Sequence, residues 1–233
     1  MIWALHGAFG DADDWRELGS ALEPERLISV DLWAGEHDLP LHAWACAFNL
    51  RVGAVDSDPV LLGYSMGARL GLHALVESEA PWKAAILVSP HPGLSSAAAR
   101  TARRQMDDVW LKRFDMLDWP EFWAEWTNQP VLAGGGARPD SPARRARRRG
   151  LASWSLAEQA DLRSDLERIR CPVLWITGER DEKFTAIGAT AASLVPDCEQ
   201  AVVPGIGHRV PWDAPGEFLR LVEDFLRTKC DQS

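Results

Sequence analysis

Asp58-Pro-Val-Leu-Leu-Gly-Tyr-Ser-Met-Gly-Ala-Arg69 is the stretch of the sequence that decides its fold. The apolar run Val60–Leu62 predicts a buried strand, and Gly63–Gly67 fits the pattern G-x-S-x-G just before an amphipathic helix, Leu70–Glu77. A serine on so sharp a strand-to-helix turn stands above the sheet, where its Oγ is exposed. The flanking glycines are needed because side chains there would crowd the strand and the helix. We therefore predict that Ser65 is the nucleophile or base of a catalytic site.

The first strand and turn of the chain predict a second part of this site. Ile2–Leu5 is a short apolar run, and it ends in the glycine-rich segment His6-Gly-Ala-Phe-Gly10. In enzymes with a serine on an elbow, an early loop of this kind supplies one backbone N–H of the oxyanion hole. We expect the N–H groups of Ala8 and Met66 to fill that role. Taken alone, His-Gly is also an ordinary turn dipeptide.

Strands and helices alternate along most of the chain, which predicts an α/β fold. Further strands are expected at residues 27–32, 84–88, 172–177 and 199–203, and amphipathic helices near 15–22, 44–52 and 217–226. This alternation is typical of a doubly wound, mostly parallel sheet with its reactive loops at the carboxyl ends of the strands. Almost no residues precede the first strand, so we expect an antiparallel N-terminal hairpin to be reduced or absent.

One long block interrupts the alternation. Residues 94–165 form helical pieces rich in Ala, Arg and Trp, with breaks expected at Pro120, Pro130 and Gly134–Gly136. We predict a single domain over residues 1–233, with residues 94–165 inserted in it as a helical lid. Most tryptophans of the block are expected to form the core of that lid.

Two residues supply what a serine needs in order to react at neutral pH. Serine requires an imidazole to take its proton and an acid to orient that imidazole. Asp181 and His208 each follow a predicted strand, and the order Ser65, Asp181, His208 is that of the α/β-hydrolases. We therefore predict these three as the catalytic residues.

Other titratable residues are assigned lesser roles. Glu179 and Glu182 flank Asp181 and are interpreted as solvated neighbours. His91 also follows a strand and is expected to face the site, and Asp213 is expected to cap the last helix. The remaining candidates are interpreted as helix or loop histidines with local bonds: His37, His42 and His73.

The composition narrows the class of protein. The formal charge of −9 disfavours nucleic acid or anionic lipid as a partner, and no long apolar run predicts a membrane span. The first residues lack the basic start of a signal peptide, so we expect a cytoplasmic protein. We also expect a monomer or a homodimer. The cysteines are scattered without a C-x-x-C pair, so we expect reduced thiols, no metal site and no cofactor: Cys46, Cys171, Cys198 and Cys230.

Several segments of the sequence resemble those of one known enzyme family more specifically than the triad does. They are Gly63–Arg69, His91–Leu94, Phe122–Val131, Gly178–Phe184 and Gly207–His208. Together they resemble the α/β-hydrolase superfamily and, within it, 2-succinyl-6-hydroxy-2,4-cyclohexadiene-1-carboxylate synthase, an enzyme of menaquinone biosynthesis that eliminates pyruvate. The similarity extends from about Leu5 to Phe225.

The resemblance implies a substrate with several carboxylates, which arginines would bind, and a triad that acts as a base. It implies substrate-binding roles for Tyr64, Arg69, Arg103, His91 and one of the two lid tryptophans Trp123 and Trp126. A further arginine of that family falls within a run in which the register is lost: Arg144, Arg145, Arg147, Arg148 and Arg149. Most of this run is expected to be a solvated helix face.

Two alternatives remain open at this point. Carboxylesterases and thioesterases have the same three catalytic residues, so the triad alone does not choose between elimination and hydrolysis. Some proteins of this fold only bind ligands, but they usually lack a member of the triad, whereas this chain has all three.

Overall fold

The computed structural model describes residues 1–22, 26–35, 39–132 and 144–230. Six strands form one sheet in the order β2-β1-β3-β4-β5-β6, and all neighbouring pairs are parallel. The strands are β1 (Ile2–Leu5), β2 (Leu27–Val30), β3 (Val60–Tyr64), β4 (Ala84–Val88), β5 (Val173–Gly178) and β6 (Cys198–Val203). The α/β prediction is thus confirmed, and no antiparallel strand precedes β1 in the described residues.

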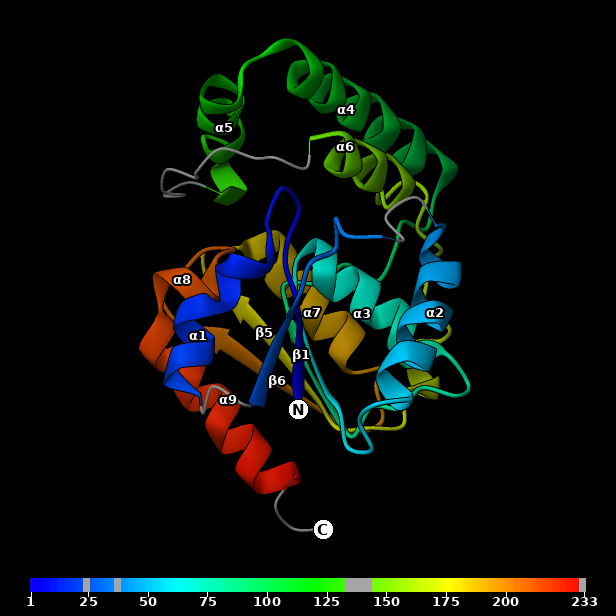
Figure 1. Cartoon of the computed structure of the whole chain (residues 1–233), viewed down its shortest axis with the longest axis vertical. Coiled ribbons are helices and arrows are strands. Elements are labelled where there is room, and N and C mark those ends of the chain that lie inside the picture. Colours follow the sequence, from blue (N-terminus) through cyan, green and yellow to red (C-terminus); the bar gives the residue numbers. More distant parts are fainter. Residues whose placement is uncertain (23–25, 36–38, 133–143, 231–233) are drawn as a thin grey trace.

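Helices cover both faces of the sheet (Figure 1). One face packs against α2 (Leu41–Gly53), α3 (Met66–Val76) and α7 (Glu182–Ala192), and the other against α1 (Arg16–Ala21), α8 (Val210–Asp213) and α9 (Pro215–Lys229). Short 3₁₀ helices lie at Ala12–Trp15 (η1), Pro130–Leu132 (η3) and Leu166–Arg168 (η4). Buried apolar side chains fill both interfaces, so the sheet is a rigid platform for the loops at its carboxyl edge.

The strand order reverses its direction at β1. The chain passes from β1 outward to β2 and then returns to β3 on the other side of β1. In an open parallel sheet, such a switch leaves a crevice at the carboxyl ends of the two adjacent strands. The loops that follow β1 and β3 are therefore the expected place for a ligand, and they contain Ala8 and Ser65.

Three helices lie above this edge of the sheet, between β4 and β5 in the sequence (Figure 1). They are α4 (Ala97–Met116), α5 (Trp119–Thr127) and α6 (Arg144–Ser153). Phe114, Trp119 and Phe122 form an aromatic core between them, and Phe9 from the loop after β1 enters the same core. No strand occurs in the described part of residues 94–165.

Some sequence predictions needed correction. The helix after the elbow begins at Met66 and not at Leu70, because the serine itself is its N-cap residue. Pro120 does not break a helix but lies in the first turn of α5, where a missing N–H costs nothing. Asp213 does not cap α9; it lies in α8 and pairs with Arg209. Gly134–Gly136 and His37 lie outside the described residues.

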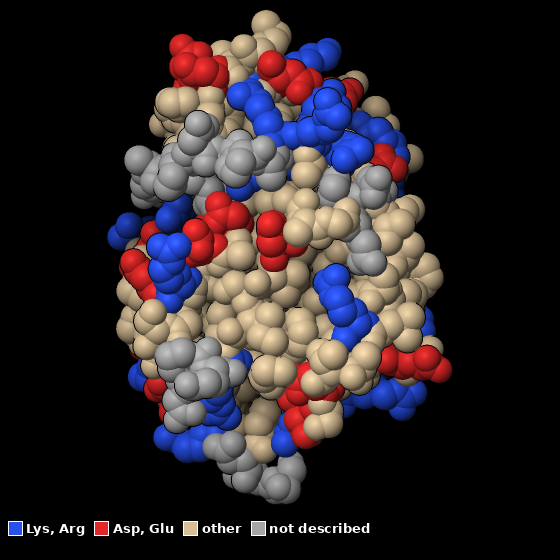
Figure 2. All heavy atoms as spheres, viewed as in Figure 1, with Lys and Arg blue, Asp and Glu red and all other residues tan. Residues whose placement is uncertain are grey.

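No described helix has both the length and the apolar character to cross a membrane. Basic residues concentrate in two helices above the sheet, since α4 and α6 carry five Lys and Arg each against three Asp in α4. Figure 2 shows basic side chains gathered over this upper part of one face. The charge distribution is therefore locally basic in a protein of net charge −9.

Candidate active site

Ser65 occupies a strained elbow between β3 and α3. Its backbone has φ 52° and ψ −108°, and residues other than glycine rarely adopt a positive φ. A Cβ at Gly67 would lie 2.3 Å from the carbonyl oxygen of Leu5, and one at Gly63 would lie 2.6 Å from Cα of Ala68. Only glycine permits these close approaches, so the G-x-S-x-G pattern follows directly from the packing of the turn.

Ser65 is the first member of a hydrogen-bonded chain of three side chains. Its Oγ lies 3.0 Å from Nε2 of His208, and Nδ1 of the same ring lies 2.5 Å from Oδ2 of Asp181. Asp181 and His208 are buried, whereas Ser65 is half-buried. Because Asp181 accepts from Nδ1–H, Nε2 is left as the acceptor for the serine proton.

Backbone contacts fix the two loops that carry the acid and the imidazole. The N–H of Arg180 donates to the carbonyl of Ile206 at 2.8 Å, and the N–H of Gly205 donates to the carboxylate of Glu179 at 2.7 Å. Glu179 is exposed, as expected, but it also joins these loops. The ring of Phe184 packs on that of His208, with centroids 4.6 Å apart. The imidazole therefore has little freedom to rotate away from the serine.

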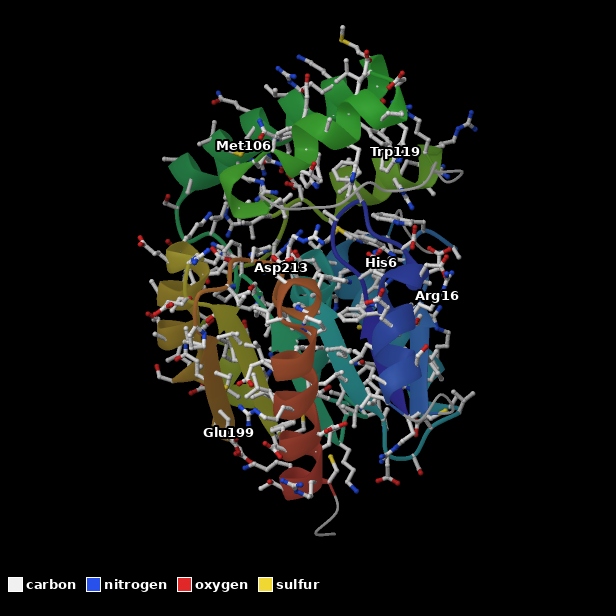
Figure 3. All side chains as sticks on the ribbon, turned by 90° about the vertical axis from the view of Figure 1, so that its left-hand side faces the viewer. His6, Arg16, Met106, Trp119, Glu199 and Asp213 are labelled. Atoms are coloured by element: carbon white, nitrogen blue, oxygen red, sulfur yellow. The ribbon has the colours of Figure 1, made fainter. Side chains whose placement is uncertain are left out.

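The loop after β1 is held in place by His6. Leu32 N–H donates to His6 Nε2 at 3.1 Å, so the proton is on Nδ1, which donates to the Gly7 carbonyl at 2.9 Å. Phe9, with φ 58°, inserts its ring into the aromatic core of the helices above. Figure 3 shows His6 and Asp213 just beneath these helices, which carry Met106 and Trp119.

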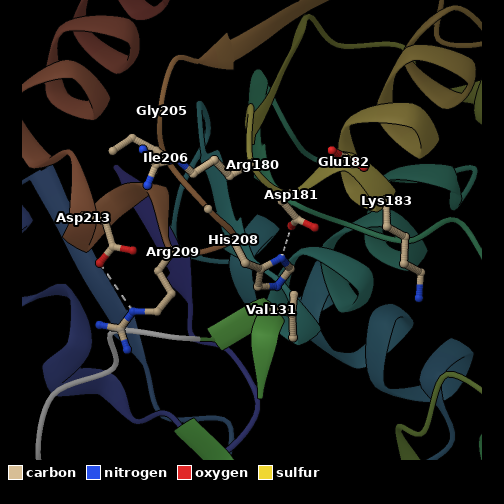
Figure 4. A pocket seen from close by; sticks show the side chains of 11 residues that line it. Val131, Arg180, Asp181, Glu182, Lys183, Gly205, Ile206, His208, Arg209 and Asp213 are labelled. Atoms are coloured by element: carbon tan, nitrogen blue, oxygen red, sulfur yellow. Dashed lines mark hydrogen bonds and ion pairs between the residues drawn. The ribbon is translucent and has the colours of Figure 1, made fainter. Parts of the chain in front are cut away.

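Two cavities lie near the serine. The larger, about 580 Å³, is lined by His208 and Asp181 and by charged side chains of both signs, including Arg180, Glu182, Lys183, Arg209 and Asp213 (Figure 4). The smaller, about 50 Å³, is lined by both residues expected to form the oxyanion hole, Ala8 and Met66, and by Arg69, Arg103, Asp107, Trp110, Trp126 and Trp154, among others. Met66 is the first residue of α3, so its N–H has no acceptor within the helix.

Arg69 is a buried cation in the wall of the smaller cavity. Its guanidinium donates to Oε1 of Gln159 at 2.8 Å and to the carbonyl of Trp154 at 2.7 Å, and it forms no ion pair within the described residues. Burial, with the nearby charge of Arg103 acting in the same direction, lowers its pKa to about 9. The group therefore remains charged at neutral pH.

Arg103 lines the same cavity but has an acidic partner. Its Nε lies 2.8 Å from Oδ1 of Asp107, one turn further along α4. The other oxygen of Asp107 lies 2.5 Å from Oγ of Ser155. The cavity wall therefore contains two guanidinium groups and one carboxylate, an excess of one positive charge.

His91 is buried beside the site and is neutral. Its Nδ1 accepts the N–H of Gly93 at 3.1 Å, and its ring packs edge-on against Phe184. Burial, helped by the charges of Lys183 and Arg69, lowers the pKa of His91 to about 4. His91 therefore adds no positive charge to the site.

The predicted pocket aromatics differ in their position. Trp126 lines the smaller cavity, whereas Trp123 stacks on Trp119 in the aromatic core of the upper helices. Tyr64 packs between His208 and Trp212, beneath the serine, and lines neither cavity. Its predicted contact with substrate is therefore not supported by this geometry.

Only Arg147 of the arginine run is buried. Its guanidinium lies over the rings of Trp33 and Trp119 and 3.4 Å from the carboxylate of Asp11. Arg144 donates to the carbonyls of Phe114 and Leu117 at the end of α4. The others form the exposed face that was expected: Arg145, Arg148 and Arg149.

The sequence did not reveal Gln159 or Trp154, which hold Arg69. They lie between elements, in a segment without periodic apolar residues, and a glutamine or a carbonyl group carries no chemical motif. Only the fold shows their role, because it places Gln159 and Trp154 against a buried arginine 85 to 90 residues earlier in the chain.

Comparisons with known proteins identify the family of this chain. Residues 4–221 match the family model described as "Alpha/beta hydrolase family". The 2-succinyl-6-hydroxy-2,4-cyclohexadiene-1-carboxylate synthase of Klebsiella pneumoniae (strain 342) is 33% identical over 95% of this chain and 92% of its own. The synthase of Escherichia coli (strain K12 / DH10B) is 31% identical, with 96% and 92% covered.

Solved structures show the same fold. MenH from S. aureus superposes with a TM-score of 0.82 at 23% identity, covering 98% of this chain and 93% of its own. A thermophilic esterase from Thermogutta terrifontis gives 0.71 at 22% identity, covering 97% and 89%. The chain therefore belongs to the alpha/beta hydrolase family, as an enzyme similar to the synthases of that family.

Proposed function

We propose that this enzyme eliminates pyruvate from a succinylated cyclohexene carboxylate, the reaction of the synthase that it resembles. Ser65, His208 and Asp181 form the catalytic triad, and the N–H groups of Ala8 and Met66 form the oxyanion hole. The substrate is a small polycarboxylate of the cytoplasm, and the helices of residues 94–165 act as a lid over it. No cofactor is required for a proton transfer of this kind.

The burial of the Arg69 guanidinium is the main support for this proposal. A buried guanidinium with no ion pair in the described residues is costly, because the charge has lost its water without gaining a counter-ion. A substrate carboxylate would supply that counter-ion through the planar fork of the guanidinium. A neutral ester would leave the cost uncompensated. Arg103 offers a second contact, shared with Asp107.

The proposed chemistry uses the triad as a base. His208 Nε2 accepts the proton of Ser65 Oγ, and the serine oxygen removes the proton next to the succinyl ketone. The ketone oxygen becomes an enolate, which the N–H groups of Ala8 and Met66 stabilise. The electron pair then forms a carbon–carbon double bond as the C–O bond to the enolpyruvyl group breaks. The leaving enolpyruvate takes up the proton held by His208 Nε2 and becomes pyruvate.

Hydrolysis of a carboxylic ester or thioester is the alternative. Arg103 is already paired with Asp107, and apolar side chains including Phe9, Leu111 and Leu151 complete the wall of the smaller cavity. A site of this kind also accepts an acyl group, and several proteins of the same fold are esterases.

The deciding experiment is to incubate the enzyme with the enolpyruvyl substrate and to follow pyruvate with a coupled dehydrogenase. We expect pyruvate release well above the uncatalysed background. Background release, together with rapid turnover of simple acyl esters, would favour the hydrolase.

A further inference from the structure

A second cluster of reactive side chains lies away from Ser65. His42 and Cys46 are one turn apart on α2, and Glu77 follows the end of α3. Each of the three residues offers one possible ligand atom, and these atoms lie within 4.8 Å of one another. The three side chains are therefore close enough to share one ion. Ser65 is at the opposite end of α3, about 16 Å along the helix. The reaction proposed for Ser65 makes no use of these side chains.

The imidazole of His42 is oriented by Glu77. Its Nδ1 lies 2.8 Å from Oε1 of Glu77, and its Nε2 faces Sγ of Cys46 at 3.9 Å. A histidine that binds a metal through one ring nitrogen commonly donates its other N–H to a carboxylate, which fixes the ring and its tautomer. That arrangement is present here before any ion is bound.

The spacing of the two remaining donors fits a tetrahedral ion. With Zn–N of about 2.0 Å and Zn–S of about 2.3 Å, a nitrogen and a sulfur ligand of one zinc lie about 3.6 Å apart. The observed separation of His42 Nε2 and Cys46 Sγ is 3.9 Å, so a small side-chain movement brings both into range. His42 is exposed, and Cys46 and Glu77 are half-buried, so water can complete the coordination.

We propose that His42 and Cys46 bind a divalent ion of the zinc class, with Glu77 holding the imidazole. Thiolate and imidazole are the donors that such ions prefer, and the carboxylate contributes negative charge next to the ion. The hydrogen bond between His42 and Glu77 would link this ion site on α2 to the far end of α3, the helix that begins at the elbow.

The same three groups could instead make Cys46 a reactive nucleophile. An activated cysteine needs a lowered pKa, but burial and the neighbouring Glu77 raise the pKa of Cys46. A raised pKa is the opposite of what an activated thiol needs, and the metal site rests on the spacing of the donor atoms.

Cobalt titration of metal-free, untagged protein tests the proposal. Co²⁺ should produce a thiolate-to-cobalt charge-transfer band that saturates at one ion per chain and that Zn²⁺ removes. Cys46→Ser should abolish the band, and Glu77→Gln should weaken cobalt binding about 10- to 100-fold. Cys198→Ser, a matched change at another half-buried thiol, should leave the band intact. No band in the wild type, or an unchanged band in Cys46→Ser, would overturn the site.

A second measurement needs no variant. Zn²⁺ should slow the alkylation of Cys46 by iodoacetamide in the wild-type protein, while Cys198 should react at the same rate with and without zinc. Equal rates for Cys46 with and without zinc would contradict the proposal, whatever the folding of the variants.

Discussion

The guanidinium of Arg69 and the side-chain amide of Gln159 form a buried hydrogen bond of 2.8 Å between α3 and the segment that precedes β5. Gln159 is fully buried, and its Nε2 donates to the carbonyl of His91 at 2.7 Å. Its own carbonyl accepts a hydrogen bond from Arg100 of α4. The glutamine therefore holds the buried cation in place while leaving its charge without a counter-ion.

Replacing Gln159 by glutamate should provide Arg69 with an internal counter-ion. The new carboxylate would compete with a substrate carboxylate for the guanidinium, so kcat/KM for the polycarboxylate should fall about 30-fold or more, because breaking one buried charge contact costs about 2 to 5 kcal/mol. Cleavage of p-nitrophenyl acetate should change little, since a neutral ester does not need the cation. Steady-state kinetics with both substrates measures the difference.

Gln159→Met is the matched control, because it removes the hydrogen bonds without adding charge. It should lower the free energy of unfolding by about 1 to 3 kcal/mol by leaving buried groups unsatisfied. It should affect the polycarboxylate reaction less than Gln159→Glu does. If the methionine variant loses the polycarboxylate reaction as fully as the glutamate variant, the added charge is not the cause of the loss.

Truncating the cation itself should separate the two substrate classes more strongly. Arg69→Ala should lower kcat/KM for the polycarboxylate by several hundredfold, in line with about 2 to 5 kcal/mol for a buried charged contact. Turnover of p-nitrophenyl acetate should remain within a few-fold of the wild type. Arg104→Ala removes an arginine whose ion pair with Glu158 is exposed, and it should leave both activities unchanged.

A hydrolase with a neutral substrate predicts no such difference between the two substrates. Arg69→Ala would then act only through stability, so both substrates would lose activity in the same proportion. Comparing the ratio of the two kcat/KM values, instead of either value alone, removes the effect of a partly unfolded sample.

Much of the fold could be predicted because its elements have strong local patterns. The strand Ala84–Val88 was predicted with the bounds that the structure shows, since a fully buried parallel strand is a continuous apolar run between turns. The elbow at Ser65 was equally clear, because its two glycines are required by contacts below 3 Å. At the strand and at the elbow, the residue types that the fold requires also form a recognisable local pattern in the sequence.

The parts of the site that the sequence left open depend on tertiary contacts. Arg147 is one of five arginines in a short run, and only the packing of α6 against Trp33 and Trp119 distinguishes it from its solvated neighbours. His73 was expected to have local bonds, but the structure buries its ring and leaves Nε2 without a hydrogen-bond partner in the described residues. The periodic pattern of a helix shows on which side of the helix a residue lies. It does not show which other element packs against that side.

The elbow geometry predicts a serine that reacts with acylating and phosphonylating probes. A fluorophosphonate should label Ser65 rapidly, and Ser65→Ala should abolish labelling, because Nε2 of His208 is placed to accept the proton of its Oγ. Intact-protein mass spectrometry measures the added mass. This labelling tests the triad without a physiological substrate.

Ser89 provides the matched control. It follows β4, it also has a positive φ (49°), and it is fully buried, but its Oγ has no hydrogen-bond partner among the described residues. Ser89→Ala should therefore label as the wild type does. Labelling that survives in Ser65→Ala would place the reactive serine elsewhere and remove the basis for the proposed triad.

The pH dependence of stability should report the buried histidines. Burial, reinforced by the charge of Arg69, lowers the pKa of His73 to about 4, and His91 is lowered to a similar value. Between about pH 6.5 and pH 4 the unfolded chain binds protons that the folded protein does not, so the free energy of unfolding falls as the pH falls. For one such histidine, the loss between pH 7.5 and pH 5 is about 2 kcal/mol.

His73→Gln isolates this contribution, because glutamine is polar and similar in size but does not titrate. Urea unfolding at pH 7.5 and pH 5 should show that the variant loses about 2 kcal/mol less than the wild type over this interval. The carboxylates of the protein also titrate there, but they are the same in both proteins and cancel in the difference. An identical loss in both proteins would mean that His73 binds its proton as readily in the folded chain as in the unfolded one. The ring would then be hydrated, contrary to its 4% exposure.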